Sequence, residues 1–145
     1  MALFNPSRDQ VRQFFFDAWA KLQQQQALSE IEAMAVDVMQ AHPEYHHVLN
    51  APERYRDQSY FPEMGETNPF LHMSLHLSVL EQVSIDQPPG IKAAYHSLWR
   101  QHGDAVEAQH VLMECLAEAI WQAQRGGAGL DAQAYIDSIQ AKARD

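Results

Sequence analysis

Asn68 to Val83 reads NPFLHMSLHLSVLEQV, and this stretch decides the fold. Asn followed by Pro is a common helix start, with Asn at the cap and Pro in the first turn. Apolar and polar residues alternate from Leu71 to Val79, which is also the pattern of a β-strand. We predict a helix, because the segment is long and the chain offers no convincing partner strand. A helix that is apolar nearly all round is expected at the centre of a bundle.

Two histidines, His72 and His76, interrupt this apolar stretch. Residues four apart lie on one face of a helix, so the two imidazoles should project together. A side chain that can charge near neutral pH needs a partner in an apolar setting. A transition metal ion is one such partner, and a carbonyl or carboxylate group is another.

The same spacing recurs at His110 and Glu114, in a second segment that we expect to be helical. Glu118 extends this polar stripe, and Ala117 and Trp121 lie beside it, so we expect the stripe to run along the buried side. Helical bundles commonly build metal sites from inward His and Glu residues on facing helices. We therefore predict four metal ligands, His72, His76, His110 and Glu114, with Glu44, His46, His47 and Glu118 as additional ligands. His42, which precedes Pro43, and His96 receive no role.

The remaining segments are also expected to be helical. Residues that commonly begin or end helices recur along the chain, namely Ser7, Ser29, Gly103, Asp104 and Asp131. Residues 50–67 show no period and contain prolines, a glycine and charges, which indicates an irregular connection. The fold class that follows is all-α: a helical bundle of five to six helices with one long irregular loop, residues 50–67. We expect a single domain, residues 1–145.

Composition excludes several classes of partner. The formal net charge is -9 and the ten Lys and Arg residues are spread thinly, which argues against nucleic acid. A single cysteine allows no internal disulfide and fits a reducing compartment. The chain has no signal-peptide pattern and no apolar run of membrane-spanning length, so we expect a cytoplasmic protein without a membrane partner. Gly126 to Gly129 follow a helix, so there is no nucleotide or flavin signal.

Three functions remain open, and the sequence does not decide whether the protein is an enzyme. The first is binding of one or two divalent metal ions, for which iron or zinc suits a His and carboxylate set better than magnesium. The alternative is a non-enzymatic interaction or structural module, a homodimer included, with structural histidines and an exposed apolar patch. That patch would be built from Phe14, Phe15, Trp19 and Trp99. The third is a pocket for an unknown small molecule, covered by Tyr60 and Phe61 of the loop.

Three segments carry a resemblance to a known family: HPEYHHVL from His42, NPFLHMSLHLSVLEQ from Asn68 and QHVLMECLAEAIWQAQR from Gln109. Together they resemble a small bacterial family known only as a domain of unknown function. The resemblance covers most of the chain. It implies a short, all-helical cytoplasmic protein and no assigned activity.

A second likeness is to haemerythrin-type bundles, which hold two irons with His-x-x-x-His and His-x-x-x-Glu pairs. Here His72 with His76, and His110 with Glu114, are similar to those two pairs. The chain order is reversed, and a His-x-x-x-x-Asp element is missing. Oxygen carriage is therefore not implied.

Overall fold

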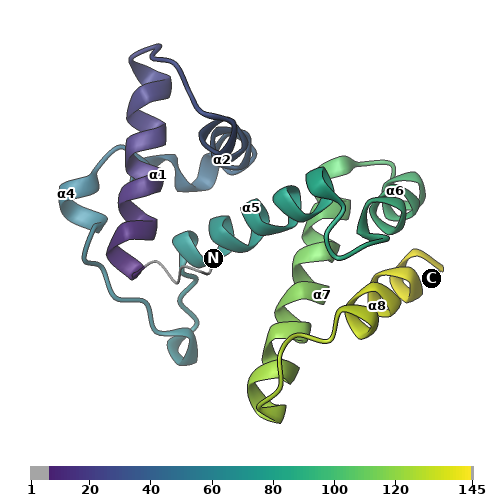
Figure 1. Ribbon diagram of the computed structural model, residues 1–145. Helices are drawn as coiled ribbons and strands as arrows, with labels where there is room; N and C mark the ends of the chain where they lie inside the picture. The colour runs from purple at the N-terminus through teal and green to yellow at the C-terminus, as the bar shows by residue number, and fades with distance from the viewer. Residues whose placement is uncertain (1–6, 145) are drawn as a thin grey trace. The chain divides into compact units, whose positions relative to one another are not determined.

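The structure is a computed structural model that describes residues 7–144 (Figure 1). Within this range every secondary-structure element is helical, which confirms the all-α class. The longer helices are α1 (Arg8–Gln23), α2 (Glu30–Gln40), α5 (Pro69–Ile85), α6 (Ile91–His102), α7 (Ala105–Gly126) and α8 (Ala132–Arg144). The short elements are η1 (Pro43–Tyr45), α3 (His46–Leu49), α4 (Pro52–Tyr55) and η2 (Pro62–Met64).

The predicted count of five to six helices is too low, because residues 7–144 contain eight α-helices. The two additional helices, α3 and α4, have four residues each. Segments this short carry too few residues to show an apolar period. Pro52 begins α4 and Pro62 begins η2, so the segment 50–67 is less irregular than expected. Proline favours the first position of a helical turn because its φ is already set and its missing N–H is not needed there.

Residues 69–85 form one continuous helix, α5, so the alternative interpretation of this segment as a β-strand is wrong. The Asn68 side-chain oxygen accepts hydrogen bonds from the backbone N–H groups of Phe70, at 3.0 Å, and Leu71, at 3.2 Å. Asn68 therefore caps the helix, and Pro69 follows it as expected. Phe70 is buried, but Leu71 is 58% exposed, so α5 is not covered on all sides. No helix among residues 7–144 is long and apolar enough to cross a bilayer.

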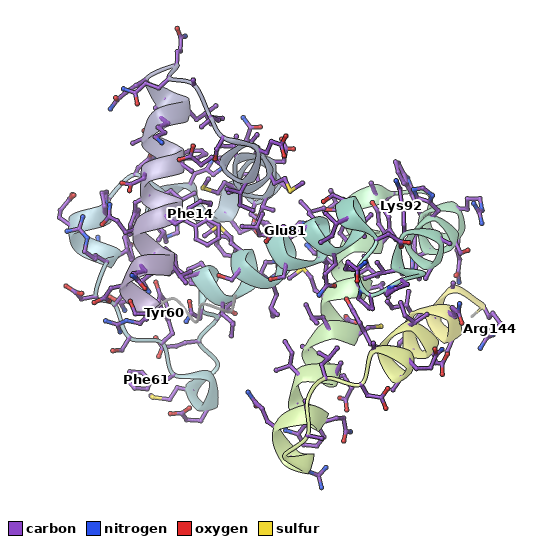
Figure 2. All side chains as sticks on the ribbon, in the orientation of Figure 1. Phe14, Tyr60, Phe61, Glu81, Lys92 and Arg144 are labelled. Carbon is purple, nitrogen blue, oxygen red and sulfur yellow. The ribbon has the colours of Figure 1, made fainter. Side chains whose placement is uncertain are left out.

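Contacts divide the chain into two compact units, and the boundary falls between Ser74 and Leu75, inside α5. In the first unit, α1 packs on α2 and α3. The predicted caps of both long helices are confirmed, since Ser7 and Ser29 each form a capping box. The side chain of Phe61, in the segment after α4, is exposed (Figure 2).

The core of the first unit includes two aromatic residues, Phe15 and Trp19, that belong to the predicted exposed patch. Phe15 is 1% exposed and Trp19 is 7% exposed. The Trp19 indole N–H donates to the side-chain oxygen of Asn50, at 2.8 Å. The prediction of an exposed patch is therefore wrong for these two residues. Of the four residues in the predicted patch, only Trp99 is among the exposed large hydrophobic side chains, at 44%.

In the second unit, α6, α7 and α8 pack on one another. Their shared core contains Ile91, Leu98, Leu112, Tyr135 and Ile139. Asp104 caps α7 by accepting from the N–H of Val106 at 2.8 Å, as predicted. Gly103 ends α6 with a positive φ of 73°, a conformation that costs glycine less than other residues.

Candidate metal site

Helix α5 carries two of the predicted ligands one turn apart, and this spacing is set by its start. The Asn68 cap and Pro69 fix where the helix begins, so His72 and His76 follow on one face. His76 is 1% exposed, and His72 is half-buried.

In the first unit, His72 is paired with His42. Their ring centroids are 4.5 Å apart and their planes meet at 81°. His42 lies between α2 and η1, and its backbone is not helical because Pro43 follows it. His42 is 3% exposed, and a ligand nitrogen of each ring lies within 4.8 Å of one on the other. Tyr45 stacks on His42, with ring centroids 5.3 Å apart.

In the second unit, His76 is paired with His110 of α7. The two ring centroids are 5.3 Å apart and the planes meet at 65°. A ligand nitrogen of one ring again lies within 4.8 Å of one on the other. Nitrogens bound to one zinc ion lie about 3.3 Å apart, given metal–nitrogen bonds of about 2.0 Å. Each pair is thus close to the separation that a shared ion requires.

A carboxylate orients the His42 ring. Nδ1 of His42 lies 2.9 Å from Oε2 of Glu44. When Nδ1–H donates to this carboxylate, the lone pair sits on Nε2, which is the arrangement that metal-binding histidines use. Burial works to raise the pKa of Glu44, but the hydrogen bonds that its carboxylate accepts, that from His42 first, outweigh burial, so the pKa is lowered.

An amide orients the His76 ring. Nε2 of His76 lies 2.6 Å from the side-chain oxygen of Gln109. The Gln109 amide nitrogen donates to the hydroxyl of Tyr95, at 3.2 Å. Because the amide nitrogen is committed to Tyr95, the Gln109 oxygen faces the ring as an acceptor. His76 then donates from Nε2 and carries its lone pair on Nδ1.

Sequence reasoning missed His42. The ring lies outside any long helix, so helical spacing could not reveal it. Two signals were present: Pro43, which keeps His42 out of a helical conformation, and Glu44, which is near enough to accept a hydrogen bond from the ring. Glu44 was predicted as an additional ligand, and the structure places it behind the His42 ring.

The predicted ligand Glu114 is exposed, and so is Glu118, which accepts a hydrogen bond from Gln122 at 2.8 Å. Neither carboxylate joins the His76–His110 pair as a third potential ligand. The expectation that their stripe runs along the buried side of α7 is wrong, since Ala117 is exposed and Trp121 is 49% exposed. The buried side of α7 is formed instead by Ala108, Leu112, Met113, Cys115 and Leu116.

The two remaining candidates on α3 have other neighbours. Nε2 of His46 lies 2.8 Å from the backbone oxygen of Met39, and its ring packs on Trp19 with centroids 4.6 Å apart. His47 is exposed and packs edge to face on Tyr55. Neither residue joins the His42–His72 pair as a third potential ligand.

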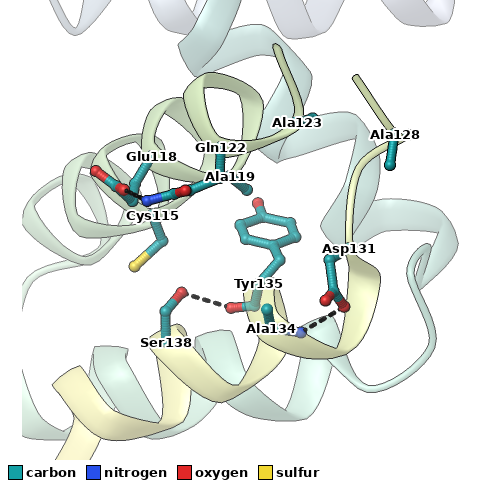
Figure 3. A pocket seen from close by; sticks show the side chains of 11 residues that line it. Cys115, Glu118, Ala119, Gln122, Ala123, Ala128, Asp131, Ala134, Tyr135 and Ser138 are labelled. Atoms are coloured by element: carbon teal, nitrogen blue, oxygen red, sulfur yellow. Dashed lines mark hydrogen bonds between the residues drawn. The ribbon is translucent and has the colours of Figure 1, made fainter. Parts of the chain in front are cut away.

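A separate cavity of about 280 Å³ lies between α7 and α8 (Figure 3). Its lining is mainly apolar and includes Cys115 and Tyr135. Ser138 donates to the backbone oxygen of Tyr135, at 2.7 Å. Burial raises the pKa of the Cys115 thiol, which opposes formation of a nucleophilic thiolate.

Comparison with known proteins finds the family of the chain, and that family has no assigned activity. A family model described as "Domain of unknown function (DUF1841)" matches residues 7–141. The expected resemblance to a family of unknown function is therefore confirmed. Neither the curated proteins nor the solved structures contain a match to the chain.

Proposed function

We propose that this chain, which belongs to the family described as a domain of unknown function (DUF1841), binds a transition metal ion through four histidines. The ligands are His42, His72, His76 and His110. The observation that carries the proposal is the one-turn spacing on α5. Helix α5 contributes one histidine to each of two imidazole pairs, and within each pair the ligand nitrogens approach within 4.8 Å.

The donor chemistry narrows the choice of ion. Imidazole suits zinc, iron, copper and nickel, whereas magnesium and calcium take oxygen ligands. Four neutral imidazoles leave the ion's double positive charge uncompensated. The Glu44 carboxylate behind His42 supplies part of the compensation, as carboxylates behind metal-binding histidines commonly do. Zinc or iron remains our proposal for the natural ion.

Metal analysis of protein purified without a nickel column tests the proposal. After incubation with zinc or ferrous iron and desalting, we expect about one equivalent of bound metal. His76→Gln and His110→Gln should bind less than about a tenth of an equivalent. His96→Gln and His102→Gln are matched controls, because both histidines are exposed, and they should bind as the parent protein does.

The geometry of the bound ion is tested by cobalt substitution. Four ligands around one Co²⁺ give the intense visible absorption of a tetrahedral centre. Two equivalents of cobalt without that absorption would mean that each histidine pair holds its own ion. A parent protein that retains only background metal would remove the proposal.

The alternative is that these histidines are structural. The hydrogen bonds of His76 to Gln109 and of His42 to Glu44 favour it, because each ring has an internal partner. In that case, His76→Gln and His110→Gln lower the free energy of unfolding equally with and without metal. A metal-binding role requires that the loss be larger when metal is present.

A further inference from the structure

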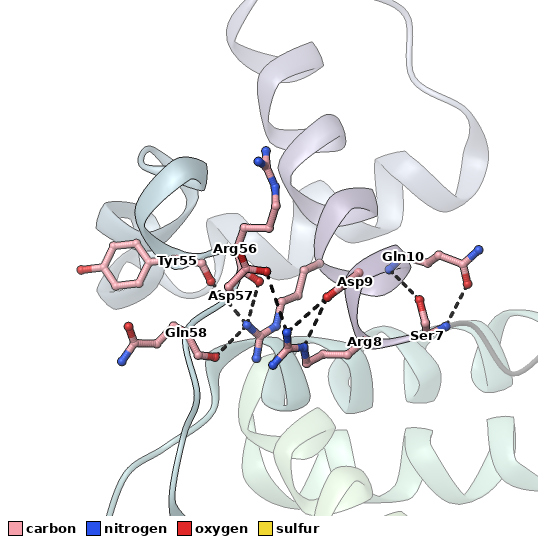
Figure 4. A network of polar contacts seen from close by, with 9 residues as sticks. Ser7, Arg8, Asp9, Gln10, Tyr55, Arg56, Asp57 and Gln58 are labelled. Atoms are coloured by element: carbon pink, nitrogen blue, oxygen red, sulfur yellow. Dashed lines mark hydrogen bonds and ion pairs between the residues drawn. The ribbon is translucent and has the colours of Figure 1, made fainter.

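Arg12 of α1 is the most unusual charged residue of the first unit, because it is only 2% exposed. Its Nη1 donates to the backbone oxygens of Arg56, at 2.9 Å, and Gln58, at 2.8 Å. The backbone oxygen of Tyr55 lies 3.4 Å away. These contacts hold the end of α4 and the residues that follow it around one guanidinium group; Figure 4 shows Tyr55, Arg56 and Gln58.

Acidic groups compensate the charge of Arg12 only in part, since Asp9 and Asp57 act on it without an ion pair. Among residues 7–144 it forms no ion pair, and its Nε is buried without a hydrogen bond. The guanidinium lies over the ring of Phe70, 4.7 Å from the centroid. Burial, together with the charge of Arg8, lowers the pKa of Arg12. A cation this deeply placed is costly unless an anion approaches it.

A cavity of about 200 Å³ lies beside this residue, and all of its lining belongs to the first unit. Arg8 and Arg12 contribute positive charge to it, and Val11, Phe70 and Leu71 contribute apolar surface. The first N–H groups of α5 are already bonded to Asn68, so attraction for an anion comes from the two arginines.

We propose that this cavity binds a short-chain carboxylate. The carboxylate group lies between Arg8 and Arg12. The aliphatic tail packs on Val11, Phe70 and Leu71. Arginine suits a carboxylate because its planar N–H groups match the two oxygens. No histidine lines this cavity, so carboxylate binding can be tested independently of metal binding.

Arg8 must exchange partners for the ligand to bind. It lies 3.3 Å from Asp9 and 3.9 Å from Asp57, and both side chains are well exposed (Figure 4). Exposed pairs of this kind contribute little stability, so a ligand carboxylate competes with them at low cost. Asp57→Asn should therefore strengthen binding, and Arg8→Gln should weaken it.

Calorimetric titration of the full chain tests the proposal, with hexanoate as the probe. A ligand of this size should bind with a Kd of about 1 mM. Hexanol tests the charge, acetate tests the tail, and inorganic phosphate tests the choice of anion. We expect all three to bind at least about threefold more weakly than hexanoate. Equal binding of hexanol, or tighter binding of phosphate, would overturn the proposal.

Variants at the cavity mouth keep the test independent of folding. Leu71 lines the cavity and is 58% exposed, so substitution there should leave the fold intact. Leu71→Glu places a negative charge at the mouth and should weaken hexanoate binding about tenfold or more, whereas the neutral Leu71→Gln should weaken it about threefold or less. Equal affinities for the two variants, or no binding to the parent protein, would refute the site.

Discussion

The rings of His42 and His72 meet edge to face with centroids 4.5 Å apart, although one precedes η1 and the other lies near the start of α5. Two local rules produce this contact. Pro43 keeps His42 out of a helix, and the Asn68 cap sets the position of His72 on α5. The pair that supports metal binding thus depends on a cap and a proline, and neither residue is itself a ligand.

Removal of the carboxylate behind His42 should weaken metal binding without abolishing it. Glu44→Gln loses the charge that fixes the His42 tautomer and offsets the charge of the ion. We expect an affinity about 10-fold to 100-fold lower, measured by competition with a coloured chelator. Glu53→Gln, an exposed acid on α4, is the matched control. An unchanged affinity in Glu44→Gln would show that this carboxylate has no role in binding.

Replacement of Arg12 should destabilise the protein. Arg12→Met keeps most of the side-chain volume but leaves the carbonyl groups of Tyr55, Arg56 and Gln58 without their donor. We expect a loss of about 2–4 kcal/mol in the free energy of unfolding, measured by urea titration. Arg56→Met is the control, because the Arg56 side chain is exposed and only its backbone oxygen is used. Similar losses in both variants would contradict this account.

The two compact units should unfold together, because α5 is continuous across their boundary. Leu112→Ala, in the core of the second unit, should cost about 2–5 kcal/mol. With Trp99 and Trp121 replaced by Phe, the fluorescence of Trp19 reports on the first unit alone. We expect Leu112→Ala to lower the urea midpoint seen by Trp19, and the exposed control Leu130→Ala to leave it unchanged. A Trp19 midpoint that does not move would mean two independent domains.

Stability should fall in alkaline solution. Burial raises the pKa of the Tyr135 hydroxyl, which donates to Gln82 at 2.7 Å, and burial also raises the pKa of the Cys115 thiol. The folded state therefore holds these protons at a pH where the unfolded chain releases them. The resulting stability is complete below the unfolded pKa and is lost as pH rises above about 10 for tyrosine.

Urea midpoints measured from about pH 8 to pH 11 test this expectation. Tyr135→Phe should be less stable at neutral pH, because the hydrogen bond to Gln82 is lost. Its stability should then decline less steeply with pH than that of the parent protein. Parallel declines in the two proteins would show that Tyr135 does not contribute.

The sequence alone was sufficient to predict the helices that begin with a strong N-cap residue. Ser7, Ser29, Asn68 and Asp104 each accept a backbone hydrogen bond at the expected helix start. These signals are local, and so they survive without knowledge of the tertiary structure. They also decided α5, where alternation of apolar and polar residues alone favoured a strand.

The orientation of α7 could not be read from the sequence. Its alanines and apolar residues occur on more than one side, so a stripe through His110, Met113 and Ala117 was as plausible as the one observed. The structure buries Leu112 and Cys115 and leaves Ala117 and Glu114 exposed. Packing against α6 and α8 determines which side of α7 is buried. These are tertiary contacts, which the local sequence pattern does not reveal.

The boundary between the compact units falls in the helical turn that separates His72 from His76. A cut in that turn, by a protease or by expression of the gene as two shorter pieces, would leave one imidazole pair on each fragment. Neither fragment would then possess the complete coordination sphere that we propose. Recovery of tetrahedral cobalt colour on mixing would report that the severed halves had reassembled.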